Sequence, residues 1–429
     1  MERQQVDLNM DKTPFKFLYL CRDLKFSFYD LLRNREVNIK TKLDMYNYIR
    51  THKKHILLLP PDLQYTDENI EHLQENIELA LQFLGKEPDD CLLPVNCKIF
   101  TSNTDYDVKL HPPLEALIAI NDSGVRISLN IMIDFDDPHI WDGAYTNRLK
   151  YIFDILKRIE CLKIDFNFSE QDEDEFSVLS AESSILYFNE IQLLVRKQDS
   201  QLKSLSICKM ELNASQLISC LQEITELSSF SMSDVFLYNP DQDFLNIRDL
   251  GKEFCEALLL KPLSKLKLSN TLIDSSYPIL NVLPYLRPEI LLKLRTLNLS
   301  DRMSFCDLHH GDRPIFSMKL YKSLANLEKL NLADNGINKE CMKILSPLIQ
   351  SLNNLKELNL ADNGIDGNCI DELIPTLQMF RSLSELCLSS NNLDYDAIKR
   401  VTESLPMLKV LDVTDNNPSQ EQTGMESIV

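Results

Sequence analysis

The segments LEKLNLADNGI at 327–337, LKELNLADNGI at 355–365 and LSELCLSSNNL at 383–393 are nearly the same sequence, and they begin 28 residues apart. Each has leucine at its first, fourth and sixth positions, asparagine at its ninth and an aliphatic residue at its eleventh. A fixed internal period of this length indicates a repeat architecture, in which neighbouring repeats stack and bury one continuous core. These segments therefore decide the fold.

The middle segment indicates how one repeat folds. Leu358 and Leu360 alternate with polar residues, which predicts a short strand with its leucines on one side. Asn363 follows where the chain must turn, and its amide suits the backbone groups that a turn leaves unpaired. Apolar residues spaced by three and four from Asn368 to Phe380 predict a helix covering the strand leucines. Stacking then predicts a ladder of asparagines, formed by Asn335, Asn363, Asn391 and Asn416.

A strand and a helix in about 28 residues resemble the ribonuclease-inhibitor-like class of leucine-rich-repeat proteins. The resemblance implies an α/β solenoid, a horseshoe with parallel strands on its concave face and helices on its convex face. Weaker copies of the strand begin at Ile159, Leu202, Leu227, Leu263, Leu294 and Leu408. Successive spacings of 25, 36, 31 and 33 from Leu202 to Leu327 indicate insertions. We expect repeats over 151–417, regular from 327, and a flexible tail over 418–429.

Residues 1–150 follow a different pattern. Apolar residues at helical spacing predict a helix over 66–84, and strict alternation predicts a strand over 125–135. The sequence Asn-Asp-Ser-Gly at 121–124 is typical of a turn and predicts a hairpin with 117–120. These elements form either an α/β cap or repeats too degenerate to recognise. The sequence leaves both alternatives open.

Composition limits the class of protein. The chain has 429 residues, 44% of them hydrophobic, and no apolar run approaches the roughly 20 residues of a membrane helix. The polar N-terminus does not resemble a secretory signal. Eleven cysteines without paired spacing, including Cys341 and Cys369 on the apolar side of repeats, predict buried thiols in a reducing compartment. The net charge of −20 disfavours nucleic-acid binding. We therefore expect a cytoplasmic monomer that binds neither membrane nor nucleic acid.

Motifs for catalysis are missing from the sequence. It contains no phosphate-binding loop, no Gly-x-Ser-x-Gly elbow and no His-Glu-x-x-His pair, so we expect neither an enzyme nor a cofactor. One insertion holds residue types that ligate zinc, but without paired cysteines it is more typical of an ordinary loop. Cys387 falls on the outward side of its strand, where it is either a plain half-exposed cysteine or a reactive thiol. The residues of that insertion are Cys306, Asp307, His309, His310 and Asp312.

The concave face is the expected binding surface, because the outward residues of the strands lie there. Charge on this face changes from basic to acidic along the array. This gradient either orients a charged partner, or the polar residues simply form the solvated surface of the sheet. Few aromatic residues occur on it, so no obvious hot spot is predicted. The candidate residues are Lys203, Lys265, Lys267, Arg295, Glu328, Lys329, Asn331, Asp334, Lys356, Glu357, Asn359, Asp362, Glu385 and Asp412.

We therefore expect a scaffold that binds a protein partner, either one with a basic surface or a small GTPase. The repeats resemble the activator of the GTPase Ran, but the acidic extension of that family is not matched, since the tail has only Glu421 and Glu426. A substrate adaptor of a ubiquitin ligase is a further alternative. The terminus Ser427-Ile428-Val429 resembles a PDZ-domain ligand. The same tail resembles the export signals of bacterial effectors, which implies action in a host cytosol.

Overall fold

A computed structural model describes residues 71, 73–84, 87–101, 108–135, 142–168, 179–197, 201–238, 247–259, 261–273, 277–278, 287–300 and 323–416. The chain divides into two compact units. Unit 1 comprises Met1–Glu173 and Asn189–Leu202, and unit 2 comprises Asp174–Phe188 and Lys203–Val429. Helix α7 (Ala181–Lys197) contributes residues to both. The zinc-ligand types of the insertion, Cys306 to Asp312, and the tail over 418–429 lie outside the described residues.

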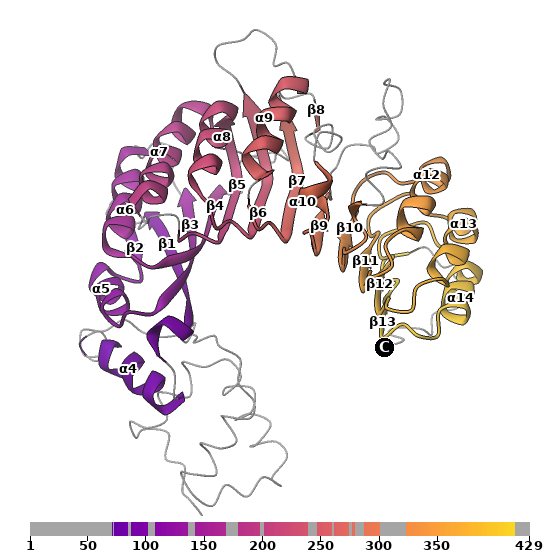
Figure 1. Ribbon diagram of the computed structural model, residues 1–429, viewed down its shortest axis with the longest axis horizontal. Coiled ribbons are helices and arrows are strands. Elements are labelled where there is room, and N and C mark those ends of the chain that lie inside the picture. The colour runs from indigo at the N-terminus through magenta and orange to yellow at the C-terminus, as the bar shows by residue number, and fades with distance from the viewer. Residues whose placement is uncertain are drawn as a thin grey trace, which may run out of the picture. The chain divides into compact units, whose positions relative to one another are not determined.

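Unit 1 consists of a small sheet with helices on one of its faces (Figure 1). Its sheet order is β2-β1-β3-β4, with β1, β3 and β4 parallel and β2 antiparallel to β1. The strands are β1 (Leu92–Thr101), β2 (Val108–His111), β3 (Arg126–Phe135) and β4 (Ile159–Phe168). The helices are α4 (Leu73–Leu84), the 3-10 turn η2 (Pro88–Asp90), α5 (Leu114–Asp122) and α6 (Asp142–Ile155). Alternate residues of β3, such as Ile127, Leu129 and Ile131, are at most 1% exposed and form the core.

The strand predicted over 125–135 and the described part of the helix predicted over 66–84 are confirmed. The predicted hairpin is wrong, because 114–122 is helical and β3 pairs in parallel with β1 and β4. The turn sequence instead ends α5: the Ser123 hydroxyl donates to the Ile120 carbonyl, and Gly124 has a φ of 71°. A glycine in this left-handed conformation is a common helix terminator. The same residues that suit a hairpin therefore close a helix.

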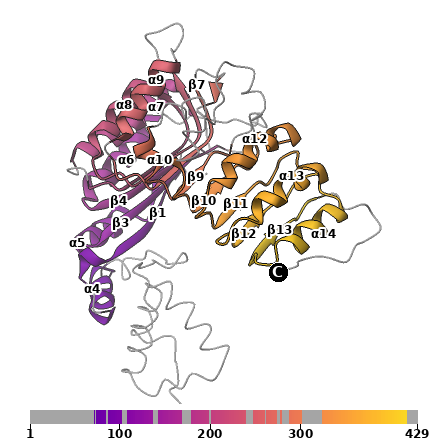
Figure 2. The same ribbon diagram turned by 45° about the vertical axis from the view of Figure 1, so that its right-hand side comes forward.

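Unit 2 alternates strands and helices in chain order. The strands are β5 (Ser204–Asn213), β6 (Ser229–Tyr238), β7 (Lys265–Ile273), β8 (Tyr277–Pro278), β9 (Thr296–Asn298), β10 (Lys329–Asn331), β11 (Glu357–Asn359), β12 (Glu385–Cys387) and β13 (Val410–Asp412). The helices are α8 (Ala214–Glu223), α9 (Ile247–Leu259), α10 (Pro288–Leu291), α12 (Lys339–Gln350), α13 (Gly367–Leu377) and α14 (Tyr395–Ser404). All neighbouring strands are parallel except β8, which is antiparallel to β7. Figure 2 shows α12, α13 and α14 in a row, and each contacts the next.

The strand register confirms the spacing read from the sequence. Ser204 lies opposite Ser229, Ser229 opposite Lys265, Lys265 opposite Thr296, and Thr296 opposite Lys329. These offsets repeat the predicted spacings of 25, 36, 31 and 33 residues. One buried residue from each of seven strands, β5, β6, β7, β9, β10, β11 and β12, forms a stack that is 0–3% exposed. Its members are Leu205, Phe230, Leu266, Leu297, Leu330, Leu358 and Leu386. The fold is an α/β leucine-rich-repeat solenoid.

The predicted asparagine ladder is also confirmed. Asn363 Nδ2 donates to the carbonyls of Leu332, Leu360 and Ala361 at 3.1, 3.0 and 2.9 Å. Its Oδ1 accepts from the backbone amides of Asn335 and Ile337 at 3.0 and 2.9 Å. The carbonyl of Leu332 and both amides belong to the preceding repeat, so each asparagine ties two repeats together. Asn391 and Asn416 make the equivalent bonds one and two repeats further on.

The irregular repeats differ from the regular ones in the length of their strands. Lys209, Asp234 and Asn270 have φ values of 56°, 56° and 46°. Each interrupts the pairing of its strand without shifting the register, and the strand continues beyond it. Asp334 and Asp362 have the same left-handed conformation, but there the chain turns away from the sheet. The residue after each of these three, where regular repeats have asparagine, is Met210, Val235 or Thr271. Without the asparagine, the strand runs on to nine or ten residues.

Eight of the described cysteines are free, and six of these are buried. The expectation of unpaired thiols alone is wrong for Cys341, which is disulfide-bonded. In the part of the chain that the structure describes, no helix is long and apolar enough to cross a bilayer.

Candidate functional site: the outward face of the strands

The outward side chains of unit 2 form three rows, because parallel strands in register place equivalent residues side by side. Every member of the three rows is exposed or half-buried. The leading row precedes the strands: Lys203, Ser228, Ser264, Arg295, Glu328, Lys356, Ser384 and Lys409. The first row is Ser204, Ser229, Lys265, Thr296, Lys329, Glu357, Glu385 and Val410. The second row is Ser206, Ser231, Lys267, Asn298, Asn331, Asn359, Cys387 and Asp412.

Backbone hydrogen bonds hold the leading row in place. The carbonyl of Arg295 accepts from the amides of Glu328 and Lys329 at 2.8 and 2.9 Å. The carbonyl of Glu328 accepts from Lys356 and Glu357 in the same way, at 2.8 and 3.1 Å. Since each carbonyl receives two amides of the next repeat, the backbone leaves little freedom for one repeat to slide along another. The side chains above it are therefore presented at fixed spacing.

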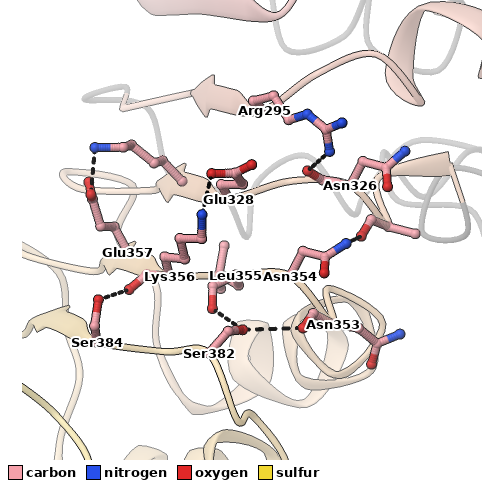
Figure 3. A network of polar contacts seen from close by, with 12 residues as sticks. Arg295, Asn326, Glu328, Asn353, Asn354, Leu355, Lys356, Glu357, Ser382 and Ser384 are labelled. Atoms are coloured by element: carbon pink, nitrogen blue, oxygen red, sulfur yellow. Dashed lines mark hydrogen bonds and ion pairs between the residues drawn. The ribbon is translucent and has the colours of Figure 1, made fainter.

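Four of the predicted site residues pair with one another across neighbouring repeats (Figure 3). Lys356 Nζ lies 2.7 Å from Glu328 Oε2, and Lys329 Nζ lies 2.5 Å from Glu357 Oε1. The hydrogen bond and the charge of Lys356 lower the pKa of Glu328, so this carboxylate stays ionised. Ion pairs at the surface contribute little to stability. Their main effect here is to cancel charge between β10 and β11.

Polar side chains also connect the leading row and the residues beside it to loops of adjacent repeats, as Figure 3 shows. Arg295 Nη1 donates to the Asn326 carbonyl at 3.0 Å. Asn354 Nδ2 donates to the Ala325 carbonyl at 3.0 Å, and Ser382 Oγ donates to the Leu355 carbonyl at 2.8 Å. These bonds connect residues 27 to 31 positions apart, so they fix one repeat against the next.

Several second-row residues hold the turn that follows the strand. Asn331 and Asn359 each accept, at 2.9 Å, from the amide two residues further on. Asp412 accepts from Thr414 in the same way at 3.0 Å, and this bond lowers the pKa of its carboxyl group. Side chains of this type bend the backbone locally and are engaged before any partner arrives. The predicted site residues Asp334 and Asp362 follow in the left-handed turn.

Cys387 occupies the second-row position of the last regular repeat. It is half-buried, as expected for a plain cysteine on the outward side. Its Sγ lies 3.2 Å from Ser389 Oγ and 3.4 Å from Asp412 Oδ2, so it takes the place of the turn-forming asparagine.

The predicted cations Lys203, Lys265 and Arg295 are exposed, and Lys267 is half-buried. Lys265 and Lys267 have no ion pair within the described part of the chain, in contrast to the lysines of β10 and β11. At the other end of the rows, Glu385 is exposed and likewise has no ion pair among the described residues. Unpaired positive charge therefore lies on β7, and unpaired negative charge on β12.

The long strands add outward residues that the short-strand pattern does not predict. Beyond the left-handed residues of β5, β6 and β7, the outward positions hold Glu211, Phe236, Tyr238 and Leu272, all half-buried. Glu211 accepts from the Ala181 amide at 3.1 Å. Burial, and then the charge of Glu211, raise the pKa of Tyr238. The signal in the sequence is the continued alternation of Val235 and Leu237 after the expected turn.

The described residues offer no metal centre, since no group of three or more histidine, cysteine, aspartate or glutamate side chains in them is placed to hold an ion. Burial raises the pKa of Cys97 and of Cys255 to about 12, which keeps both thiols protonated and poorly nucleophilic. The chemistry that the outward face does offer is recognition by charge and hydrogen bonding.

No family model and no curated protein matches the chain. Among solved structures, 112 chains match. An internalin from Listeria monocytogenes is 14% identical and has a TM-score of 0.35, with 93% of this chain and 97% of that chain covered. TLR13 in complex with ssRNA13 is 16% identical at a TM-score of 0.31, covering 70% and 45%. The leiomodin-1 actin-binding site 2 is 17% identical at 0.20, covering 22% and 60%. Scores this low carry no argument, and the fold rests on the strand register and the asparagine ladder.

Proposed function

We propose that the protein is an interaction scaffold that binds a protein partner on the outward face of the unit 2 strands. The observation that carries this proposal is the set of three rows, whose exposed side chains are held in register by paired backbone bonds. A surface that is already ordered loses little conformational entropy on binding. The rows also extend over many strands, which suits a protein partner better than a small molecule.

The test reverses charge on the outward face and, as a control, on the helices. Glu357→Lys with Glu385→Lys changes β11 and β12, whereas Glu372→Lys with Glu403→Lys changes exposed positions of α13 and α14. Both double variants change the net charge equally. Each full-length chain is immobilised, and the proteins retained from a cytosolic extract are quantified by mass spectrometry. We expect the strand variant to lose partners that the parent and the helix variant retain.

Identical retention by all three chains would show that the outward face is not the binding surface. Equal losses from both variants would show that net charge, rather than this face, controls retention. Circular dichroism and thermal unfolding check that each variant is folded. Because all substituted residues are exposed or half-buried, we expect changes in unfolding free energy within about 0.5 kcal/mol.

Narrower roles use the same surface. Regulation of a small GTPase, by analogy with the Ran activator, predicts faster GTP hydrolysis when the protein is added to a candidate GTPase; unchanged rates contradict it. Action as a ubiquitin-ligase adaptor or as a bacterial effector in a host cytosol remains a hypothesis of the same kind. The eight cysteines that are free among the described residues support a reducing compartment, whereas the disulfide at Cys341 favours an oxidising one, so the compartment stays a prediction.

A further inference from the structure

The outward face of β5, β6 and β7 has a composition unlike that of β10 and β11. In each of the first and second rows, the three strands contribute serine, serine and lysine in that order. We call these six residues the serine–lysine strip: Ser204, Ser229, Lys265, Ser206, Ser231 and Lys267. Serine side chains are short, so they leave the backbone of β5 and β6 close to the surface beside two long cationic side chains.

The hydroxyl groups of the serine–lysine strip are largely unused. Ser204, Ser229 and Ser231 are half-buried and make no side-chain hydrogen bond within the part of the chain that the structure describes. Ser206 Oγ has a weak contact, 3.9 Å from Cys208 Sγ. By contrast, the hydroxyls of Ser228 and Ser264, just outside the strip, donate to backbone carbonyls. The strip therefore offers hydroxyl donors and acceptors to a ligand backbone.

The charge of the serine–lysine strip is opposite to that of the chain. The chain carries a net charge of −20, but the strip contains two lysines and no carboxylate. The outward carboxylates further along the strands are engaged, Asp234 by Asn270 Nδ2 at 2.5 Å and Glu211 by the Ala181 amide at 3.1 Å. A local cationic patch in an anionic protein selects for acidic ligands, since the rest of the surface repels them.

The geometry of β7 adds a spacing requirement. Lys265 and Lys267 are two residues apart on one face of a strand, so their Cα atoms are roughly 6.6 Å apart. An extended peptide repeats its same-side residues at the same interval. Carboxylates at alternate positions of an extended segment therefore match both lysines at once. On β10 and β11 the equivalent charges are already paired between repeats and offer no such match.

We propose that the serine–lysine strip binds an extended acidic segment of the partner, with alternate carboxylates on Lys265 and Lys267 and peptide groups on the serine hydroxyls. This inference rests on the proposed scaffold function and specifies the chemistry of its partner.

The experiment measures binding of the full chain to a short fluorescent peptide that alternates glutamate with serine, by fluorescence anisotropy. We expect binding that weakens as salt is added, and no binding of a matched peptide that alternates lysine with serine. Lys265→Glu with Lys267→Glu should weaken binding about tenfold, because two charge pairs become two repulsions. The control, Lys343→Glu with Lys399→Glu on α12 and α14, changes the net charge equally and should bind as the parent does.

Three results would overturn the inference: no binding of the glutamate peptide by the parent, binding unchanged in the strip variant, or equal weakening by both double variants. If the glutamate substitutions unfold the protein, Lys265→Gln with Lys267→Gln removes the charge alone and should still weaken binding. Ser229→Ala with Ser231→Ala tests the hydroxyls and should weaken binding without changing its salt dependence. If the peptide test fails but the variant with substitutions on β11 and β12 loses captured partners, the scaffold function is supported. Only the assignment of the serine–lysine strip to an acidic segment is then rejected.

Discussion

Asn363 bonds five backbone groups, three carbonyls through Nδ2 and two amides through Oδ1. Replacing it with alanine removes the bonds of the Leu332 carbonyl and of the Asn335 and Ile337 amides between two stacked repeats. The Leu360 and Ala361 carbonyls still accept from Asn391 Nδ2 and from the Asp334 amide. Each buried polar group that loses its partner costs about 1–3 kcal/mol, and this site is only partly buried. We therefore expect Asn363→Ala to lower the free energy of unfolding by about 3 kcal/mol, measured by chemical denaturation.

The matched control is Asn392→Ala, an exposed asparagine in the next repeat whose side chain makes no hydrogen bond within the described residues. Its loss should change stability by less than about 0.5 kcal/mol. Asn363→Asp keeps the acceptor but faces three carbonyl groups with an acidic side chain, so it should be nearly as damaging as alanine. Similar stability of all three variants would mean that the ladder is dispensable.

Lys261 is a buried cation, 4% exposed, whose Nζ donates to the Ile224 carbonyl. Burial lowers its pKa in the folded chain below its ordinary value of 10.5. Between the folded and the ordinary pKa, the unfolded chain binds more protons, so stability rises with pH in that interval. We expect the unfolding free energy of the parent, relative to Lys261→Met, to increase as the pH is raised toward 10.5.

Lys293→Met is the control for Lys261, since Lys293 is exposed and its Nζ donates to the Lys261 carbonyl at 3.2 Å. The stability of this variant should follow the parent at every pH. Parallel curves for the parent and Lys261→Met would show that the buried ammonium does not titrate differently on folding.

Among the secondary-structure elements, helix α13 is capped at its N-terminus by Asp366, whose negative charge contributes to the stability of the helix. The Asp366 carboxylate accepts from the Cys369 amide at 2.9 Å, and this bond lowers its pKa below 3.8. The stabilisation is therefore present above 3.8 and is lost as the pH falls through the folded pKa. We expect Asp366→Ala to cost about 1 kcal/mol at neutral pH. Asp366→Asn keeps a hydrogen-bond acceptor, so its loss of unfolding free energy relative to the parent should be smaller and should disappear in acid. A loss that does not change with pH would contradict an ionic role for the cap.

Register and element type follow from the sequence because the leucine positions dictate which residues face the core. Even the irregular spacing between Leu202 and Leu327 predicts the strand pairs correctly. Strand length does not follow so easily, since β6 continues through the left-handed residue Asp234, at the position where a regular repeat turns away from the sheet. The hairpin predicted at 117–124 fails for a similar reason, because one turn sequence serves two kinds of element.

The outward rows that make up the candidate site follow from the leucine register, but the contacts of their side chains do not. Asn331 and Asn359 point their oxygens back to the chain, a role that depends on the conformation after the strand. The pairing of Lys356 with Glu328 joins residues 28 positions apart, so it emerges only once the repeats are stacked. Lys265 and Lys267, which have no ion pair among the described residues, lie on a part of the face that the regular repeats do not resemble.

At the scale of the whole molecule, each of the two units buries its own apolar residues. Ile131 on β3 of unit 1 is 0% exposed, and Leu358 on β11 of unit 2 is 2% exposed. Replacing either with alanine should cost about 2–5 kcal/mol, through lost burial and the cavity that remains. In a solenoid, the loss of stability is largest in the nearest repeats, since each repeat packs mainly on its neighbours.

We therefore expect the two truncations to act regionally. Hydrogen exchange of Ile131→Ala should accelerate in β1, β3 and β4 and stay unchanged in β10, β11 and β12, whereas Leu358→Ala should do the reverse. Leu411→Ala is the control, because this half-buried leucine of β13 removes less buried area and should cost less than Leu358→Ala. Faster exchange in both units from either core variant would mean that the chain unfolds as one cooperative body. Regional exchange would instead show that each unit is stabilised mainly by its own core.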